Sequence, residues 1–184
     1  MNRNAHRLLT LAGLTRSARG AVIALVLALV VAAPAAAAQP TRTVRPLHGG
    51  FVLPAGTACA FDVAGEPTGG FVAVTTFSDG TVQVSVRARG AYVNMETGAR
   101  FPTVDSWHEL DTFDSATGLL VFATEGQTSF TLLPGDVGPF GLVGSNGAFY
   151  HIIGTTTATY DTVTGHVTQF SYTGTVTDIC AALS

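Results

Sequence analysis

The sequence predicts an all-β protein, an antiparallel up-and-down β-barrel of about eight strands closed by one disulfide. Three observations support it: the residue types, their alternation along the chain and a recurring turn pattern. Of the 146 residues from 39 to 184, 55 are Thr, Val, Phe or Tyr, and lysine is absent. β-branched and aromatic side chains suit the half-buried surface of a sheet, whereas residues that favour helices are scarce here. A β-sandwich is the alternative architecture.

Apolar and polar side chains alternate with a period of two in several segments. Within 81–89, Val84 and Val86 fall on one face and Arg87 on the other. Near the end of the chain, Phe170 and Tyr172 share a face and alternate with polar residues. This period is typical of strands that pack on a core from one side. No segment after residue 40 has a helical period.

Three segments share the turn pattern Asx-x-x-Thr-Gly: Asn94–Gly98, Asp114–Gly118 and Asp161–Gly165. An Asp or Asn side chain bonds to the backbone two residues on, and the closing glycine adopts a left-handed conformation, which suits a hairpin turn with a bulge. The strands between the turns are expected at 58–64, 70–77, 81–95, 99–113, 119–125, 128–133, 148–160 and 166–179. One long loop, Pro134 to Gly147, separates two of them.

The only two cysteines, Cys59 and Cys180, fall at the start of the first expected strand and the end of the last. In a closed barrel these positions are neighbours, so a disulfide between them would join the seam and leave no exposed edge. An exported protein with two cysteines most simply carries one disulfide. Two free thiols are the alternative.

The first 38 residues have the organisation of a secretory signal peptide. An arginine-rich start is followed by an uncharged run, Ala21 to Ala33, and by small residues that end at Ala38. The apolar run is shorter than a membrane-spanning helix requires. We expect cleavage after Ala38 and a secreted, extracellular protein, with an uncleaved anchor as the alternative. The remaining chain divides into an N-terminal extended segment, 39–57, and a single domain, 58–184.

Residues 39–184 contain five arginines and twelve acidic residues, so the net charge of this part is −7. Nucleic-acid binding depends on neutralising phosphates with Lys and Arg, so this charge argues against a nucleic-acid partner. An anionic membrane surface is disfavoured for the same reason. The sequence leaves the oligomeric state open.

Four carboxylates fall within ten residues and are weak candidates for a calcium site, because Ca²⁺ prefers oxygen ligands. They are Asp105, Glu109, Asp111 and Asp114. Their spacing does not match an EF-hand loop. The favoured interpretation is a solvated strand end with Trp107 packed on the core, and no metal.

The alternation also predicts residues that line a ligand pocket inside the barrel. These positions are Val84, Phe130, Phe170, Tyr172 and His166. An eight-stranded barrel is either filled by side chains or holds one small ligand. His151 is interpreted as a hydrogen-bonded or rim residue.

The sequence contains no catalytic or cofactor motif. The glycine-rich segment Gly141–Gly147 lacks the lysine of a phosphate-binding loop, and no G-x-S-x-G motif is present. His108 with Ser106 or Ser115 is not a recognisable catalytic pair. We therefore expect no catalytic residue and no cofactor.

The C-terminal segment Val176–Ser184, the Pro134-Gly135-Asp136 loop and the Asx-x-x-Thr-Gly turns resemble a family of small secreted actinobacterial proteins with barrels similar to allene oxide cyclase. The resemblance implies the fold and export. No catalytic residue is known for that family, so none is transferred.

These observations favour a secreted protein that binds a small apolar ligand. The alternative is an extracellular interaction or inhibitor module that acts through its loops, above all residues 134–147. A cyclase-like enzyme is the third interpretation.

Overall fold

The computed structural model of the chain describes residues 39–184, and the predicted signal peptide lies outside the described residues. Eight strands form one antiparallel sheet: β1 (Thr41–Pro46), β2 (Phe51–Leu53), β3 (Val63–Thr76), β4 (Val82–Asn94), β5 (Arg100–Asp114), β6 (Leu119–Leu132), β9 (Ala148–Asp161) and β10 (His166–Asp178). Strands β7 (Val137–Gly138) and β8 (Gly141–Leu142) form a separate small hairpin, and α2 (Ile179–Ala182) is a single helical turn.

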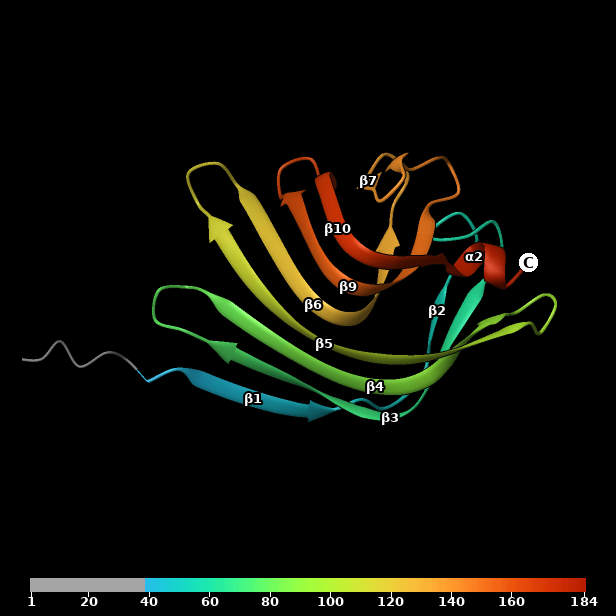
Figure 1. Cartoon of the computed structure of the whole chain (residues 1–184), viewed down its shortest axis with the longest axis horizontal. Coiled ribbons are helices and arrows are strands. Elements are labelled where there is room, and N and C mark those ends of the chain that lie inside the picture. Colours follow the sequence, from blue (N-terminus) through green and yellow to red (C-terminus); the bar gives the residue numbers. More distant parts are fainter. Residues whose placement is uncertain (1–38) are drawn as a thin grey trace, which may run out of the picture. The chain divides into compact units, whose positions relative to one another are not determined.

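The strand order, β1-β3-β4-β5-β6-β9-β10 with β2 also on β3, is that of a meander. The all-β class and the antiparallel arrangement are confirmed. The expected closure is not: within residues 39–184, β10 pairs only with β9, and β1 only with β3. The sheet is an open, strongly curved structure in which β5, β6, β9 and β10 bend upward along their length (Figure 1).

The disulfide between Cys59 and Cys180 is confirmed, but it does not join two paired strands. Cys59 lies in the loop between β2 and β3, and Cys180 lies in α2. The side chain of Asp178 accepts a hydrogen bond from the Ala181 amide and so starts α2 directly after β10. β10 therefore ends at Asp178, and it forms no pairing with β1 or β2.

Side-chain packing therefore brings the two ends of the sheet together. A cluster of buried residues surrounds the disulfide: Ala58, Cys59, Val63, Tyr92, Phe149, Ile179 and Leu183. The buried amide of Asn94 donates a hydrogen bond of 3.0 Å to the carbonyl of Leu183. A second cluster of Leu132, Val143, Tyr150 and Ile152 lies beneath the predicted long loop, which contains the β7–β8 hairpin.

Two strands are longer than predicted. Residues 63–76 and 119–132 each form one strand, whereas breaks were expected at 65–69, between the strands 58–64 and 70–77, and at 126–127, between the strands 119–125 and 128–133. Gly126, Gly154 and Gly174 lie in register across β6, β9 and β10, all with positive φ. Glycine tolerates this conformation, so the three strands bend together while their hydrogen bonds continue.

The three Asx-x-x-Thr-Gly turns are confirmed. In each turn, the glycine amide donates a hydrogen bond of 2.8 Å to the carbonyl of the first residue, which is Asn94, Asp114 or Asp161. The side-chain oxygen of that first residue accepts from the amide two residues on, at 2.8–2.9 Å. Among the described residues, no helix is long and apolar enough to cross a membrane.

Candidate ligand pocket

A pocket of about 310 Å³ opens over β3, β4 and β5. β1 pairs with residues 71–76 of β3 and β2 with residues 63–65, so the chain between β1 and β2 must cross the bulge near Gly69. This crossing segment contributes Leu47 to the pocket, and β2 contributes Phe51 directly after it. The wall formed by the sheet is mainly apolar: Val72, Val86, Ala88, Tyr92 and Trp107.

One buried carboxyl group interrupts the apolar wall. Asp105 is 9% exposed and lines the pocket. Its Oδ1 accepts a hydrogen bond of 3.0 Å from the hydroxyl of Ser129, and its Oδ2 accepts one of 3.4 Å from the hydroxyl of Tyr92. His151 Nε2 lies 3.9 Å from Oδ1. Four different strands, β4, β5, β6 and β9, thus place one polar group each around a single point.

Burial governs the protonation of this cluster. Loss of water raises the pKa of Asp105 above its ordinary value, while the Ser129 hydrogen bond and His151 act in the opposite direction. Burial and the nearby charge of Asp105 raise the pKa of Tyr92 to about 12. Tyr92 therefore keeps its proton at neutral pH and is a hydrogen-bond donor to the carboxylate.

His151 has a polar atom that the described residues leave without a partner. The residue is 7% exposed, and its Nε2 makes no hydrogen bond within residues 39–184. Its ring packs against Phe101 with the centroids 5.8 Å apart. A buried polar atom without a hydrogen-bond partner costs free energy, and Thr103, Asp111 and Thr156 have such atoms as well. His151 is thus a core residue beside Asp105, where the sequence predicted a hydrogen-bonded or rim position.

The four carboxylates proposed as weak calcium ligands do not form one site. Asp105 belongs to the pocket, and Asp114 caps the turn that follows β5. Glu109 and Asp111 lie together, and Glu109 accepts a hydrogen bond from Thr124 at 3.1 Å. Burial, followed by the charge of Asp111, raises the pKa of Glu109 to about 7. Within residues 39–184 no three acidic, His or Cys side chains are grouped in a metal-binding arrangement.

None of the five residues predicted to line the pocket lines it. Val84 lies on β4 one step beyond Val86 on the same face, and Tyr172 on β10 is 37% exposed. Phe130 and Phe170 pack edge to face, 5.6 Å apart, against the second core cluster. The prediction assumed that all eight strands enclose one interior, whereas the open sheet has a pocket over β3–β5 and separate cores elsewhere.

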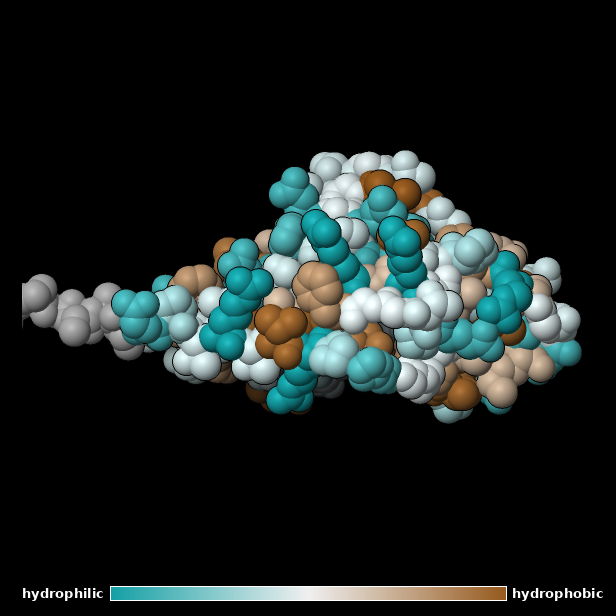
Figure 2. Space-filling model, turned by 90° about the horizontal axis from the view of Figure 1, so that it is seen from below, coloured by the Kyte–Doolittle hydropathy of each residue, from teal (hydrophilic) through white to brown (hydrophobic). Residues whose placement is uncertain are grey.

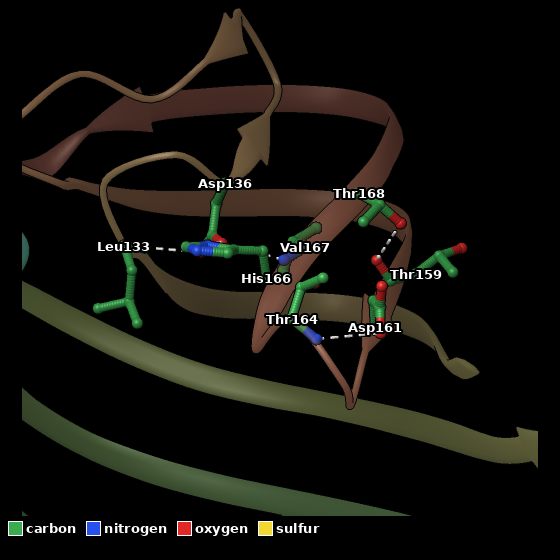
Figure 3. Close-up of polar contacts among 8 residues, drawn as sticks. All are labelled: Leu133, Asp136, Thr159, Asp161, Thr164, His166, Val167 and Thr168. Carbon is green, nitrogen blue, oxygen red and sulfur yellow. Dashed lines mark hydrogen bonds and ion pairs between the residues drawn. The ribbon is translucent and has the colours of Figure 1, made fainter. Parts of the chain in front are cut away.

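His166 holds the long loop instead of facing the pocket. Its Nδ1 lies 2.9 Å from Oδ1 of Asp136, a residue that is 4% exposed (Figure 3). The same carboxylate accepts hydrogen bonds from the amides of Leu133, at 2.7 Å, and Val167, at 3.0 Å. Asp136 thus ties both the beginning of the loop and the start of β10 to one point.

Sequence reasoning singled out Asp105 only as a metal candidate and missed Tyr92 and Ser129. Tyr92 continues the alternation of Val84, Val86 and Ala88, so its face was predictable. No sequence pattern brings Ser129 to Asp105, because the two lie 24 residues apart and meet only through the register of the bent strands.

The chain was compared with protein-family models, with curated proteins and with solved structures, and no match was found.

Proposed function

We propose that this protein is exported and binds a small, mainly apolar molecule that carries one hydrogen-bond donor, such as a hydroxyl or an amine. The observation that carries the proposal is the carboxyl group of Asp105, buried in the apolar wall of a pocket of about 310 Å³. Ligand pockets typically combine apolar walls with a few placed polar groups and begin at about 300 Å³.

The geometry around Asp105 favours a ligand that donates a hydrogen bond. A carboxylate has about four acceptor positions, and here Ser129 and Tyr92 occupy two of them. The Tyr92 contact, at 3.4 Å, is long for a hydrogen bond between oxygens. A ligand donor in the pocket would add a partner to a carboxylate that burial has deprived of water.

Export is part of the proposal because the N-terminal sequence and the disulfide both support it. The first 38 residues have the pattern of a signal peptide, and the chain forms a disulfide. Structural disulfides persist in oxidising compartments and are rare in the cytosol.

Trp107 provides the test, because it lines the pocket and is the only tryptophan in the chain. Its fluorescence is titrated with pairs of ligands that match in size and differ in the donor, such as cyclohexylmethanol and ethylcyclohexane. We expect a saturable change, and tighter binding of the alcohol by about tenfold, the value of one hydrogen bond to a charged group. Asp105→Asn should reduce this difference, and Asp111→Asn, on the same strand outside the pocket lining, should retain it.

Two outcomes contradict the proposal. One is the absence of a saturable fluorescence change with every ligand pair. The other is equal affinity for the alcohol and the hydrocarbon in the wild-type protein, which would remove the role assigned to Asp105.

A second candidate, an extracellular protein-interaction module, is favoured by one observation. Phe140 and Leu142 on the β7–β8 hairpin are 68% and 77% exposed. Large apolar side chains in such positions mark interaction sites when they form a contiguous patch. Phe140→Ser with Leu142→Ser should then abolish binding to an extracellular partner and leave the Trp107 titration unchanged.

A further inference from the structure

A second hollow, of about 360 Å³, has a different chemistry from the pocket. It is lined by Gly69, Gly70, Phe71, Arg87, Arg89, Val104 and Ser106, with the adjoining parts of Ala88 and Asp105. Because side chains alternate along a strand, Arg87 and Arg89 leave β4 on the face opposite to Val86. Ala88, Arg89 and Asp105 contribute to both hollows, but the carboxylate of Asp105 is bonded to Ser129 and Tyr92.

Strand pairing explains how the hollow forms. Arg87 lies between Phe71 on β3 and Ser106 on β5, and Arg89 lies between Gly69 and Val104. The register of β3 shifts between Pro67 and Gly69, so a bulge stands next to Arg89. Gly69 and Gly70 carry no side chains, and the space in front of Gly69 is open. Part of the lining is therefore backbone, and Arg87 and Arg89 line the hollow beside it.

The charge of these two arginines is not neutralised by a carboxylate. Within residues 39–184, the only ion pair of an arginine joins Arg100 to Glu66 at 2.6 Å. Arg87 and Arg89 are exposed and two residues apart, so their Cα atoms are separated by about 6.6 Å. Two arginine side chains that leave one strand on the same face concentrate positive charge at the hollow, and this charge would attract a bound anion. The pair stands out in a domain whose acidic residues outnumber its arginines by twelve to five.

The space-filling view from below Figure 1 shows long hydrophilic side chains spread among apolar ones (Figure 2). The hollow is likewise lined by both charged and apolar side chains. Phe71 is 38% exposed and Val104 is 48% exposed, and they flank the arginines on β3 and β5. A polar group that enters between the guanidinium groups thus has apolar surface beside it.

We infer that this hollow is a second binding site, for a ligand with one oxyanion group, a carboxylate, phosphate or sulfate, attached to an apolar part. Arg87 and Arg89 hold the oxyanion, because the guanidinium fork matches the oxygen geometry of these groups. The hydroxyl of Ser106, opposite Arg87, supplies a further donor. Phe71 and Val104 contact the apolar part of the ligand.

The test is a nuclear magnetic resonance titration of the folded domain at constant ionic strength. The probes are inorganic phosphate and sulfate for the anion, and acetate and hexanoate for the apolar part. We expect saturable shifts of the amides of residues 69–71 and 87–89, with hexanoate binding more tightly than acetate. Arg87→Gln and Arg89→Gln should each weaken binding of phosphate at least tenfold, since each removes a charge-assisted hydrogen-bond pair.

Arg42→Gln is the matched control, because Arg42 is an exposed arginine on β1 that does not line the hollow. It removes the same charge and should leave the phosphate affinity within twofold of the wild type. Arg89→Lys keeps the charge without the planar fork and should bind with intermediate affinity. An unchanged Trp107 emission spectrum shows that each variant is folded.

Shifts that grow linearly without saturation, or an equal loss of affinity in Arg42→Gln, would overturn the inference in favour of general electrostatic attraction. Equal affinity for acetate and hexanoate would overturn the role of Phe71 and Val104. The proposal for the pocket over Asp105 is tested with uncharged ligands and Asp105→Asn, whereas this one is tested with anions and the arginine variants, so the two proposals fail separately.

Discussion

Asp105 and Glu109 lie four residues apart on one face of β5, and burial raises the pKa of both. Their surroundings differ in one respect. Asp105 accepts two hydrogen bonds from hydroxyl groups and lines the pocket, which suits an acceptor for a ligand. Glu109 has Asp111 beside it, and two neighbouring carboxylates resist ionising together. A buried carboxyl group is therefore the acceptor of two hydroxyl hydrogen bonds at Asp105 and has a second carboxyl group as its neighbour at Glu109.

The raised pKa of Glu109 predicts that the folded protein loses stability as the pH rises from about 4.5 to about 7. In that window the folded state retains a proton that the unfolded state has released, so the free energy of unfolding falls with increasing pH. Glu109→Gln should flatten this slope. Urea denaturation at half-unit intervals of pH measures it. Asp114→Asn is the control: the pKa of the Asp114 carboxyl is lowered, so its removal should leave the slope above pH 4.5 unchanged. A free energy of unfolding that rises with pH through this window in the wild-type protein would contradict the prediction.

Ser129→Ala tests the Asp105 cluster directly. The substitution removes the 3.0 Å hydrogen bond to a buried carboxyl and should lower the free energy of unfolding by about 1–3 kcal/mol. It should also raise the pKa of Asp105 further, because this bond favours the charged form. Carbon-detected titration of the Asp105 carboxyl provides the second measurement. Ser85→Ala, at an exposed hydroxyl that contacts His108, is the control; an Asp105 pKa that stays constant in Ser129→Ala would show that the bond is not formed in solution.

At the scale of elements, bends and anchors decide the shape of the sheet. The row formed by Gly126, Gly154 and Gly174 lets three strands turn together, and the Asp136 carboxylate fastens the long loop to β10. Both the glycine row and the Asp136 anchor involve few residues, but they affect how strands far apart in the sequence are placed. The bend brings Ser129 on β6 toward Asp105 on β5, and the anchor holds the loop over the second core cluster.

Gly154→Ala should strongly destabilise the protein, by about 2–4 kcal/mol. The residue has a φ of 145°, and an added Cβ would collide with the carbonyl of Thr173 on the neighbouring strand. Gly144→Ala is the control, since nothing lies within 4 Å of its added Cβ. Thermal and urea unfolding compare the two variants. Equal stability of both would mean that the strand does not bend at residue 154.

The contacts of Asp136 that fix the long loop predict which of two substitutions, at Asp136 or at His166, destabilises the protein more. Asp136→Ala leaves two partly buried amides without their acceptor and should cost about 2–4 kcal/mol in the free energy of unfolding. His166→Ala should cost less than half as much, because its side chain is 43% exposed. Hydrogen exchange should report the change at the amides of Leu133 and Val167 in Asp136→Ala. Equal destabilisation by the two variants would place the main role on the histidine.

At the scale of the whole molecule, the sheet is open and the disulfide joins its two ends. Cys59 and Cys180 are separated by 121 residues, and the buried cluster around them includes residues from β3, β4, β9 and α2. A curved sheet without strand closure depends on such packing to keep its ends together. The same arrangement leaves β1 and β10 with one unpaired edge each among the described residues.

Replacing both cysteines with serine should lower the free energy of unfolding by about 4–5 kcal/mol, because the crosslink restricts a long loop of the unfolded chain. The loss should appear as a lower denaturation midpoint in urea. Reduction of the wild-type protein should give the same shift. A change below about 1 kcal/mol would indicate that the cluster around α2 holds the ends together without the crosslink.

Much of the fold follows from local patterns. Residue type predicted the Asx-x-x-Thr-Gly turns, and the period of two predicted the strands 81–95 and 148–160. The count of two cysteines predicted the disulfide between Cys59 and Cys180. The predicted breaks at 65–69 and 126–127 were wrong, because β3 and β6 continue through them. A glycine such as Gly126 can either end a strand or bend it, and the glycines in register on the neighbouring strands decide which. The single turn α2 is too short to show a period.

The sequence alone determined the all-β class, the hairpin turns, the acidic charge and the pairing of the cysteines, because these depend on composition and on contacts near in the chain. Only the tertiary structure decided that the sheet stays open and that Tyr92, Asp105, Ser129 and His151 meet. These residues come from four strands, and their proximity depends on a register shared across the sheet and on a bend at three glycines far apart in sequence. No local pattern carries that information, since it arises only when all the strands pair at once.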